Sequence, residues 1–526
     1  MAYVDFNAEG AAAALDGHEI CIVGAGAAGI LLAVRLAAQG RRVLLIETGH
    51  LSADEERQSL NVIEQTGKPM SNPVWNRKRI VGGTTTAWGG QSLPFAPLDF
   101  EPRDWVANSG WPLTYREIEP YYAAANTFMG IDSWNYHSDL YPRLGFEPPA
   151  VDPLVLDFHC SKWAREPNFR KRHEAALKAR VTVLFNAHLT RIDLGADGRV
   201  AALAIADFSG RTSRMAIGQV IIAAGGIETN RILLLNDHQV RGGLGGGSGW
   251  LGRAFMDHPS VSGGVLVPRD LRSFQRLFGT HVLRLRRYSM RLSASAHWQR
   301  SRQMLNVSSG FLFFYPEERD DPLFGAKRLL RQKDLRGIAH IVRSLPKVAA
   351  SARSVMAEGF LYKPGSAAAF AVNVEQEPTR DSHIALADAT DRFGLRKVRL
   401  HWTISEKSWR TTVAFTQAIK AQMEALGLAQ VRLASCLTDE NPDWSNAFSD
   451  VNHHMGGTRM SAAAADGVVN PDLQVWGIPN LHVASSSVFP TSSHSNPTLT
   501  LLALCERLVR KFETYGAPPP LSRRIG

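Results

Sequence analysis

The N-terminal part of the chain combines short apolar runs with a segment of helical periodicity. Residues 19–26 (EICIVGAG) are an apolar run that ends in glycines, which is typical of a buried strand. Residues 27–40 repeat apolar positions at helical spacing, and 42–49 (RVLLIETG) predict a second strand. This strand–helix–strand unit is a building block of α/β folds. The segment before it, from Met1 to His18, shows no such pattern, and we expect it to be loosely ordered.

Strand patterns return further along the chain. Residues 181–185 (VTVLF) and 220–226 (VIIAAGG) are strand-like, and a helical pattern follows at 227–236. Between about 260 and 445 the pattern is mixed, and runs such as 369–376 (AFAVNVEQ) indicate a further sheet. The C-terminal segment, from position 447 to the end, repeats the order of strand, loop and helix.

The turn after the first strand has the glycine pattern of a dinucleotide-binding site. Glycines there allow a tight turn, close approach of the backbone to a pyrophosphate and close packing of helix on strand. The helix N-terminus offers N–H groups to the phosphates. Glu47 ends the next strand, where an acid hydrogen-bonds a ribose hydroxyl, but the motif does not separate FAD from NAD. The residues of the turn are Gly24, Gly26, Ala27, Ala28 and Gly29.

Two further groups of motifs carry candidate chemistry. Residues 79–90 (RIVGGTTTAWGG) offer backbone amides and small hydroxyl groups to a flat or phosphorylated ligand, although a plain surface loop is the alternative. The other group lies near the C-terminus, in residues 452–460 (NHHMGGTRM), 467–471 (GVVNP), 481–491 (LHVASSSVFPT) and 496–500 (NPTLT).

With these motifs in order, the chain resembles the glucose–methanol–choline (GMC) flavin oxidoreductases. It is most similar to the branch that contains pyranose 2-oxidase and related sugar and glycoside oxidoreductases. The resemblance covers the N-terminal quarter, the middle segment NAHLTRI…VIIAAGGIETNRILL and the C-terminal segment from position 447 onward. Residues from about 265 to 440 match only in outline.

The resemblance implies two catalytic residues. In the family a histidine of the first C-terminal motif removes the substrate hydroxyl proton while a hydride passes to flavin N5, and the matching residue is His453. An imidazole suits this task, because its unperturbed pKa of about 6.5 is close to the operating pH. The second position falls on Asn496, which also stands where a helix N-cap is expected. His454 is the rival base, and we otherwise assign it to substrate binding.

The resemblance also implies the cofactor contacts. The run from Gly82 to Trp88 matches the loop under the flavin, and Ala187 matches the position that meets the adenine. In some sugar oxidases of this branch a histidine just before the tryptophan bonds FAD covalently; Ala87 stands at that position, so we expect non-covalent FAD. Besides the glycine turn and Glu47, the expected contacts are Gly82, Gly83, Thr84, Thr85, Ala87, Trp88, Ala187, Ala224, Gly225, Thr229, Ser486, Asn496, Pro497 and Thr498.

Three other features have weaker signals. Gln376 ends a strand that lines the substrate side of the flavin in the family, and either a substrate contact or a plain sheet edge fits it. His258, in the family-like segment 255–259 (FMDHP), is expected to be structural. Since the chain has no paired cysteines and no HExxH run, we predict no metal.

Pattern and resemblance together predict an α/β fold with α+β character in the second part. We expect a doubly wound, Rossmann-like FAD domain and a sheet-based substrate domain. The FAD domain is placed at 15–260 and 446–526, and the substrate domain at 261–445, with part of 91–180 contributing.

The formal net charge of +10 is concentrated in part in one segment. Residues 327–347 (KRLLRQKDLRGIAHIVRSLPK) are basic and carry Leu335, Ile338, Val342 and Leu345 at helical spacing. Such a helix lies on an anionic membrane, packs on its own domain or covers the active site as a lid, and the sequence leaves these alternatives open. The chain has no nucleic-acid-binding motif, and we expect no nucleic-acid partner.

The remaining composition favours a cytoplasmic protein. Four cysteines lie far apart, so a disulfide framework is not expected and a reducing compartment fits. The N-terminus lacks a basic region followed by an apolar run, and no window holds the roughly 18 apolar residues that cross a bilayer.

We therefore expect FAD-dependent oxidation of a CH–OH group on a sugar, glycoside or other polyol, a substrate class that rests on the resemblance. An NAD-dependent dehydrogenase, a flavin-dependent lyase and a non-catalytic flavoprotein are the competing functions. The sequence leaves open which hydroxyl is oxidised, whether oxygen, a quinone or another carrier accepts the electrons, and the oligomeric state.

Overall fold

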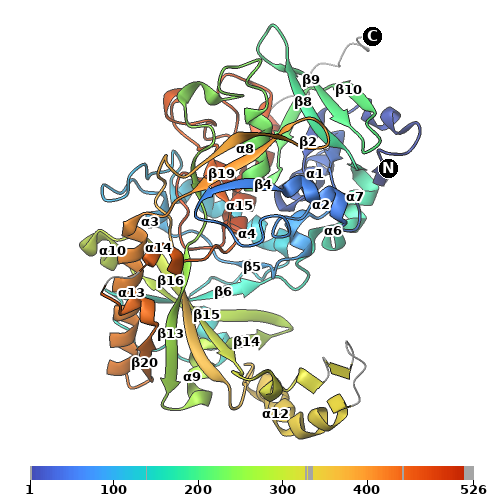
Figure 1. Ribbon diagram of the computed structural model, residues 1–526. Coiled ribbons are helices and arrows are strands. Elements are labelled where there is room, and N and C mark those ends of the chain that lie inside the picture. The colour runs from blue at the N-terminus through green and yellow to red at the C-terminus, as the bar shows by residue number, and fades with distance from the viewer. Residues whose placement is uncertain (1–2, 138, 326–327, 330–335, 441–442, 515–526) are drawn as a thin grey trace.

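The computed structural model describes residues 3–137, 139–325, 328–329, 336–440 and 443–514 (Figure 1). Its upper half in that view is built on a six-stranded parallel sheet, with strand order β1-β7-β3-β2-β11-β22. Every residue of β2, β3 and β7 is buried, as is usual for parallel strands covered on both faces. The strands are β1 (Tyr3–Asp5), β2 (Ile20–Val23), β3 (Val43–Ile46), β7 (Thr182–Phe185), β11 (Gln219–Ile222) and β22 (Leu481–Val483).

The described N-terminal residues, from Tyr3 onward, are ordered, so the expectation of a loosely ordered segment before His18 was wrong for them. Strand β1 pairs in parallel with β7, with Tyr3 opposite Val183. Phe6, Ala11 and Leu15 are buried in the main hydrophobic core. The order comes from pairing with a strand that is distant in sequence, which a local hydrophobic pattern does not reveal.

The C-terminal strand and helix complete the fold of the N-terminal segment. Strand β22 pairs with β11, which in turn pairs with β2. The last helix of the described chain joins α1 through an ion pair of 2.8 Å between Arg35 and Glu506. The helices of this half are α1 (Ala27–Ala38), α2 (Glu55–Gln58), α4 (Tyr115–Met129), α6 (Phe169–Arg172), α7 (Glu174–Arg180), α8 (Gly225–Leu234) and α15 (Pro497–Thr514).

An antiparallel sheet forms the lower half of the molecule in Figure 1. In β17 buried residues alternate with half-buried ones, and Phe370 and Val372 pack with Phe415 and Ile419 of helix α13 in one core cluster. The strand order is β20-β13-β17-β16-β15-β6-β5, and β14 pairs with β15. The strands are β5 (Gln91–Ser92), β6 (Leu156–Trp163), β13 (Ser260–Pro268), β14 (Thr280–Leu283), β15 (Arg286–Ala294), β16 (Val307–Phe314), β17 (Ala367–Val374) and β20 (Ala429–Leu433).

Two smaller sheets lie beside the parallel one. The first is an antiparallel meander of β8 (His188–Leu194), β9 (Val200–Ala206) and β10 (Thr212–Ala216). The second has the order β21-β12-β18-β19-β4, with β4 (Ile63–Gly67), β12 (Arg253–Met256), β18 (His383–Thr390), β19 (Arg396–Trp402) and β21 (Met455–Gly457). Residues 383–402 thus share a sheet with segments assigned from sequence to the FAD domain, and the exact domain limits stay a prediction.

The remaining helices are short apart from two. They are α3 (Pro97–Phe100), α5 (Leu140–Leu144), α9 (Leu271–Phe278), α10 (Ala296–Arg302), α12 (Arg336–Glu358), α13 (Glu406–Ala425) and α14 (Trp444–Ala447). Within the described ranges, none of the helices combines the length and the apolar character needed to cross a bilayer.

A fully buried ion pair connects the antiparallel sheet to the loop after α3. The two terminal guanidinium nitrogens of Arg103 donate hydrogen bonds to the Glu375 carboxylate, at 2.8 and 2.6 Å. Both side chains are inaccessible to solvent. Glu375 also accepts the Asn306 backbone N–H at 2.9 Å. A bidentate pair of this kind tolerates burial because the two charges and both carboxylate oxygens are bonded, although Arg103 Nε has no partner among the described residues.

We expect Arg103→Met to lower the free energy of unfolding by about 3–5 kcal/mol, since it leaves the Glu375 carboxylate buried and without its cation. The matched control is Arg300→Met, which removes the half-exposed pair with Glu101 and costs about 0–1 kcal/mol. Urea-induced unfolding measures both. Equal losses in the two variants would contradict the role of the buried pair.

Candidate active site

A cavity of about 700 Å³ lies between the carboxyl ends of the parallel strands and the C-terminal loops. This is the size of a site for an organic cofactor. The three motif groups singled out from sequence meet in its wall, although they are far apart in the chain. The expected residues that line it are Gly24, Gly26, Ala27, Ala28, Glu47, Gly83, Thr84, Thr85, Ala87, Trp88, Ala187, Ala224, Gly225, His453, His454, Ser486, Asn496, Pro497 and Thr498.

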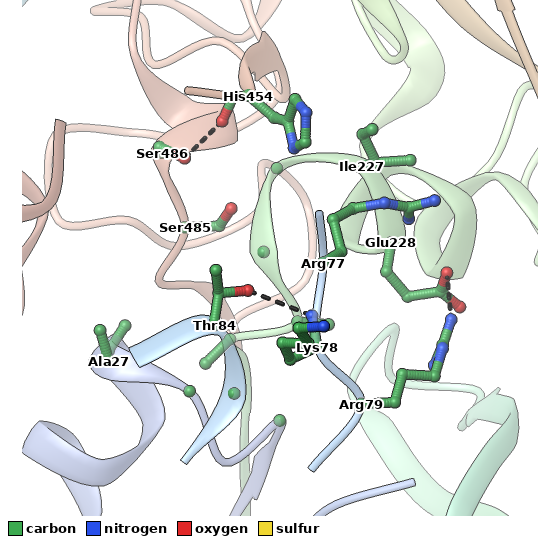
Figure 2. Close-up of a pocket in the computed structure, with 18 of the residues that line it drawn as sticks. Ala27, Arg77, Lys78, Arg79, Thr84, Ile227, Glu228, His454, Ser485 and Ser486 are labelled. Carbon is green, nitrogen blue, oxygen red and sulfur yellow. Dashed lines mark hydrogen bonds and ion pairs between the residues drawn. The ribbon is translucent and has the colours of Figure 1, made fainter. Parts of the chain in front are cut away.

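Two glycine turns pack against each other at one end of the cavity. A Cβ atom on Gly83 would lie 2.7 Å from the Cα of Gly26, and one on Gly24 would lie 2.6 Å from the carbonyl oxygen of Ala223. Gly83 and Gly24 also have positive φ, where side chains are strained. The wall is therefore bare backbone at the start of α1, near Ala27 in Figure 2, as a pyrophosphate requires.

Glu47 is fixed at the end of β3 by the backbone. Its two carboxylate oxygens accept the N–H groups of Ala25, at 2.9 Å, and Gly49, at 2.8 Å. Burial raises the pKa of Glu47, while these two hydrogen bonds favour its charged form. Each carboxylate oxygen keeps a second lone pair, which suits a ribose hydroxyl group.

A cationic run before the second glycine motif also lines the cavity. Arg77 and Lys78 lie in its wall beside Arg79, and the Lys78 backbone N–H donates to Thr84 Oγ1 at 3.3 Å (Figure 2). Arg79 pairs with Glu228 at 2.8 Å. Sequence reasoning began this motif at Arg79 and missed the two residues before it. The signal was present in the run NRKR (76–79), which is separated from the glycine pair by two residues.

Three of the expected cofactor residues lie behind the cavity wall. A Cβ atom on Gly29 would lie 1.9 Å from the Gly24 carbonyl oxygen, so Gly29 allows α1 to pack on the turn. Gly82 has a φ of 109° and donates its N–H to the Ala25 carbonyl at 2.9 Å, which joins the two glycine turns. Thr229 is completely buried within α8. These residues shape the cavity without lining it.

Gln376, expected as a substrate contact, does not line the cavity. Its amide Nε2 donates to the carbonyl oxygens of Phe255 and Thr403, at 3.0 Å each. Its Oε1 accepts the Asp257 backbone N–H at 3.0 Å and the Trp402 indole N–H at 2.8 Å. Since both polar ends are bonded within the protein, the structure gives Gln376 a structural place.

The loop that carries His453 is held by one buried carboxylate. Asp257 Oδ1 accepts backbone N–H groups from His258 at 2.6 Å, His453 at 3.0 Å and Val451 at 3.4 Å. Burial raises the pKa of Asp257 to about 7. Asn452, between the two bonded loop residues, has a φ of 65°, a left-handed conformation that asparagine tolerates better than most residues.

A chain of hydrogen bonds fixes the tautomer of His453. His258 Nε2 lies 3.1 Å from the Ser492 carbonyl oxygen, which only accepts, so this nitrogen carries the proton. Burial lowers the pKa of His258 to about 4, which leaves its Nδ1 as an acceptor. His453 Nδ1 lies 2.9 Å from His258 Nδ1 and donates a hydrogen bond to it. His453 Nε2 accepts a hydrogen bond from Asn496 Nδ2 at 3.2 Å. His453 therefore presents an unprotonated Nε2 at the cavity, and His258 sets its tautomer.

His454 points in a different direction from its neighbour. Its backbone carbonyl oxygen accepts a hydrogen bond of 2.6 Å from the Ser486 hydroxyl group, which is visible in Figure 2. Its side-chain Nε2 lies 3.9 Å from Asp257 Oδ2. Burial lowers the pKa of His454 to about 3. Gly226 lies against this residue, since a Cβ atom on Gly226 would meet the His454 carbonyl oxygen at 2.3 Å.

Comparison with known proteins finds two family models that match parts of this chain. The model of the C-terminal part of GMC oxidoreductases matches residues 378–505, and a NAD(P)-binding Rossmann-like domain matches 22–54. Residues 378–505, about a quarter of the chain, are thus similar to the GMC oxidoreductases. Over the whole length, 93% of this chain and 96% of the relative, it is 23% identical to the fructose dehydrogenase large subunit of Gluconobacter japonicus.

Other proteins are similar to this chain over shorter stretches or in the fold alone. The 6'''-hydroxyparomomycin C oxidase of Streptomyces lividus is 32% identical, over 22% of this chain and 23% of its own length. The crystal structure of pyridoxine 4-oxidase from Mesorbium loti superposes with a TM-score of 0.56 at 16% identity, covering 95% of this chain and all of that one. The likeness to that structure concerns the fold.

FAD is the cofactor of this protein, and the cavity fits the group. The bare glycine turns and the start of α1 suit the pyrophosphate, and Glu47 suits a ribose. No cluster of three or more histidine, cysteine or acidic side chains with the arrangement of a metal site occurs within the residues that the structure describes.

We expect Gly83→Ala to weaken FAD binding by about tenfold or more, because the new Cβ atom forces the two glycine turns apart. Gly40→Ala is the matched control: it also has positive φ, but nothing lies within 4 Å of its Cβ position. Flavin absorbance per protein after gel filtration gives the measurement. Full flavin content in the Gly83 variant would refute the close packing of the turns.

Proposed function

We propose that this protein oxidises the CH–OH group of a sugar, glycoside or polyol to a carbonyl, with His453 as general base. The observation that carries the proposal is the unprotonated Nε2 of His453 on the cavity wall, 3.2 Å from Asn496 Nδ2. A neutral imidazole whose Nε2 carries no proton is the form that accepts one, and a substrate hydroxyl would replace the Asn496 amide as the hydrogen-bond donor to this nitrogen.

The proposed reaction moves one proton and one hydride. The substrate hydroxyl binds between His453 Nε2 and the Asn496 amide, which donates to the hydroxyl oxygen. The hydroxyl proton passes to His453 Nε2 while the C–H bond breaks with both its electrons. The FAD held in this cavity would supply the two-electron acceptor for the hydride. His453 Nδ1–H stays bonded to His258, so the imidazole keeps its orientation as its charge appears.

A polar face of the antiparallel sheet supports a polyhydroxylated substrate. On β6, His159 and Ser161 share a face, and Arg291 of β15 is the register partner of His159. The ring of His494, just before Asn496 in the chain, lies 5.5 Å from that of His159. Within the described residues, neither ring nitrogen of buried His159 has a hydrogen-bond partner. The two unbonded nitrogens of His159, which lie beside the cavity lining and not in it, suit the hydroxyls of a sugar.

The names of two relatives agree with this class of substrate, since fructose dehydrogenase and 6'''-hydroxyparomomycin C oxidase are named for sugars or sugar-containing compounds. We further propose that FAD is bound without a covalent link. Ala87 has no nucleophilic atom next to Trp88, and acid precipitation of the protein then releases all of the flavin into the supernatant.

We expect His453→Ala to keep FAD and to slow anaerobic flavin bleaching by sugars about a hundredfold or more, as loss of a general base does. The control is His454→Ala, which removes the neighbouring imidazole that also lines the cavity. Stopped-flow absorbance of the flavin band measures both. If the His454 variant is the slow one, the base is the neighbouring residue.

The same experiment separates the competing functions. A panel of sugars, glycosides and simple alcohols is mixed with the yellow enzyme without oxygen. The compound that bleaches the flavin band is identified as the hydride donor. Air and then a quinone are added to the bleached enzyme, and the one that restores the flavin absorbance is identified as the electron acceptor. A flavin-dependent lyase or a non-catalytic flavoprotein keeps its colour with every alcohol, and a colourless protein that reduces NAD would instead be a nicotinamide dehydrogenase.

The pH dependence of bleaching follows from the charge of His453. Burial, and then the neighbouring His258, lower its pKa well below the usual 6.5, so the neutral base is present from alkaline pH down past that value. The bleaching rate should therefore stay constant from about pH 8 to about 6.5 and fall only at lower pH, where the imidazole gains a proton. A rate that already falls between pH 8 and 7 would contradict this assignment.

A further inference from the structure

Helix α12 packs on the protein with its polar face and turns its apolar face outward. Ile338, Val342, Leu345 and Met356 are exposed, with 50%, 59%, 53% and 86% of their surface accessible. Together with Ala349 and Ala352 they follow each other at alternating spacings of four and three positions, which is one face of a helix. This stripe is about 27 Å long at the rise of an α-helix. Figure 1 shows α12, in yellow, at the end of the molecule away from the parallel sheet.

The inward face of α12 is polar and is bonded to the protein. Ser351 Oγ donates to the Tyr362 carbonyl at 2.6 Å, and Lys347 Nζ donates to the Asp320 carbonyl at 3.1 Å. His340 Nε2 donates to the Asp321 carbonyl at 3.1 Å. Ser344 and Ser354 are buried, and Glu358 pairs with Arg272. These bonds fix the rotation of the helix, so its apolar stripe does not turn inward.

The positive charge of α12 indicates which kind of partner its apolar face binds. Residues 336–357 contain no acidic residue, and Arg343 and Arg353 are exposed beside the apolar stripe. Helices that combine an apolar face with flanking cations bind the boundary between headgroups and acyl chains of anionic bilayers. A second copy of the chain would bring equal cationic faces together, which costs electrostatic energy. The apolar residues are also aliphatic or methionine, whereas protein interfaces favour aromatic anchors.

We propose that the outward face of α12 docks this enzyme on an anionic membrane surface. The docking is peripheral: the stripe lies in the interface while the cations contact the phosphates. The proposal extends the sequence-based expectation of a basic amphipathic helix at 327–347. Within that segment, residues 327 and 330–335, which include Leu335, lie outside the described part of the chain. The docking face instead continues beyond that segment to Met356.

Vesicle sedimentation of the flavin-loaded protein tests the proposal. The probes are phosphatidylcholine vesicles with and without phosphatidylglycerol. We expect binding to the anionic vesicles, weakened by salt, and little binding to the neutral ones. The triple variant Ile338→Ser, Leu345→Ser, Met356→Ser should bind at least about tenfold more weakly. Arg343→Gln and Arg353→Gln should each cost about fivefold, as expected for one cation near an anionic surface.

The matched control replaces exposed apolar residues elsewhere. Val62→Ser, Leu154→Ser and Val265→Ser remove side chains of similar exposure outside α12, and vesicle binding should not change. Anaerobic flavin bleaching should be the same in all these variants, so the docking and the proposed reaction fail independently. Equal vesicle binding by the triple variant would overturn the proposal. A concentration-dependent dimer in sedimentation velocity that the triple variant abolishes would assign the face to a second copy instead.

Discussion

The active site depends on one buried carboxylate oxygen. Asp257 Oδ1 accepts N–H groups from His258 beside it and from Val451 and His453, which lie far along the chain. A buried backbone N–H without an acceptor costs free energy, and a buried carboxylate without donors costs more, so each group requires the others. Pairing of β12 with β21 brings the two segments to this distance. The position of the proposed base is thereby fixed by backbone bonds, before any cofactor or substrate takes part.

The protonation state of the site follows from the same burial. His258 and His453 are removed from water, which lowers the pKa of both imidazoles. The Ser492 carbonyl then decides which His258 nitrogen carries the proton, and this choice passes through His258 to His453. A backbone carbonyl on the loop before Asn496 thus sets the form of the proposed base. This coupling explains why residues that never reach the cavity matter to its chemistry.

The contrast between the two ends of the molecule reflects what each side chain meets. The parallel sheet buries its apolar runs completely, whereas β17 of the antiparallel sheet buries every second residue and packs with α13. Helix α12 reverses the usual arrangement, because carbonyl groups of neighbouring segments satisfy its polar side chains. Its apolar stripe is consequently left for a partner, and the cations beside it favour an anionic lipid surface.

The sequence by itself determined the strand–helix–strand unit, the glycine turns and the candidates His453 and Asn496. These depend on local requirements, such as the positive φ of Gly24 and Gly83, which only a few residue types meet. Only the tertiary structure decided the role of His258, expected to be merely structural, and the burial of Gln376, for which the sequence left a substrate contact and a plain sheet edge open. The tertiary structure also decided that β1 is an ordered strand paired with β7, and that the apolar face of α12 points outward. In each case the outcome depends on hydrogen-bond or packing partners that are distant in sequence, and a local pattern carries no information about them.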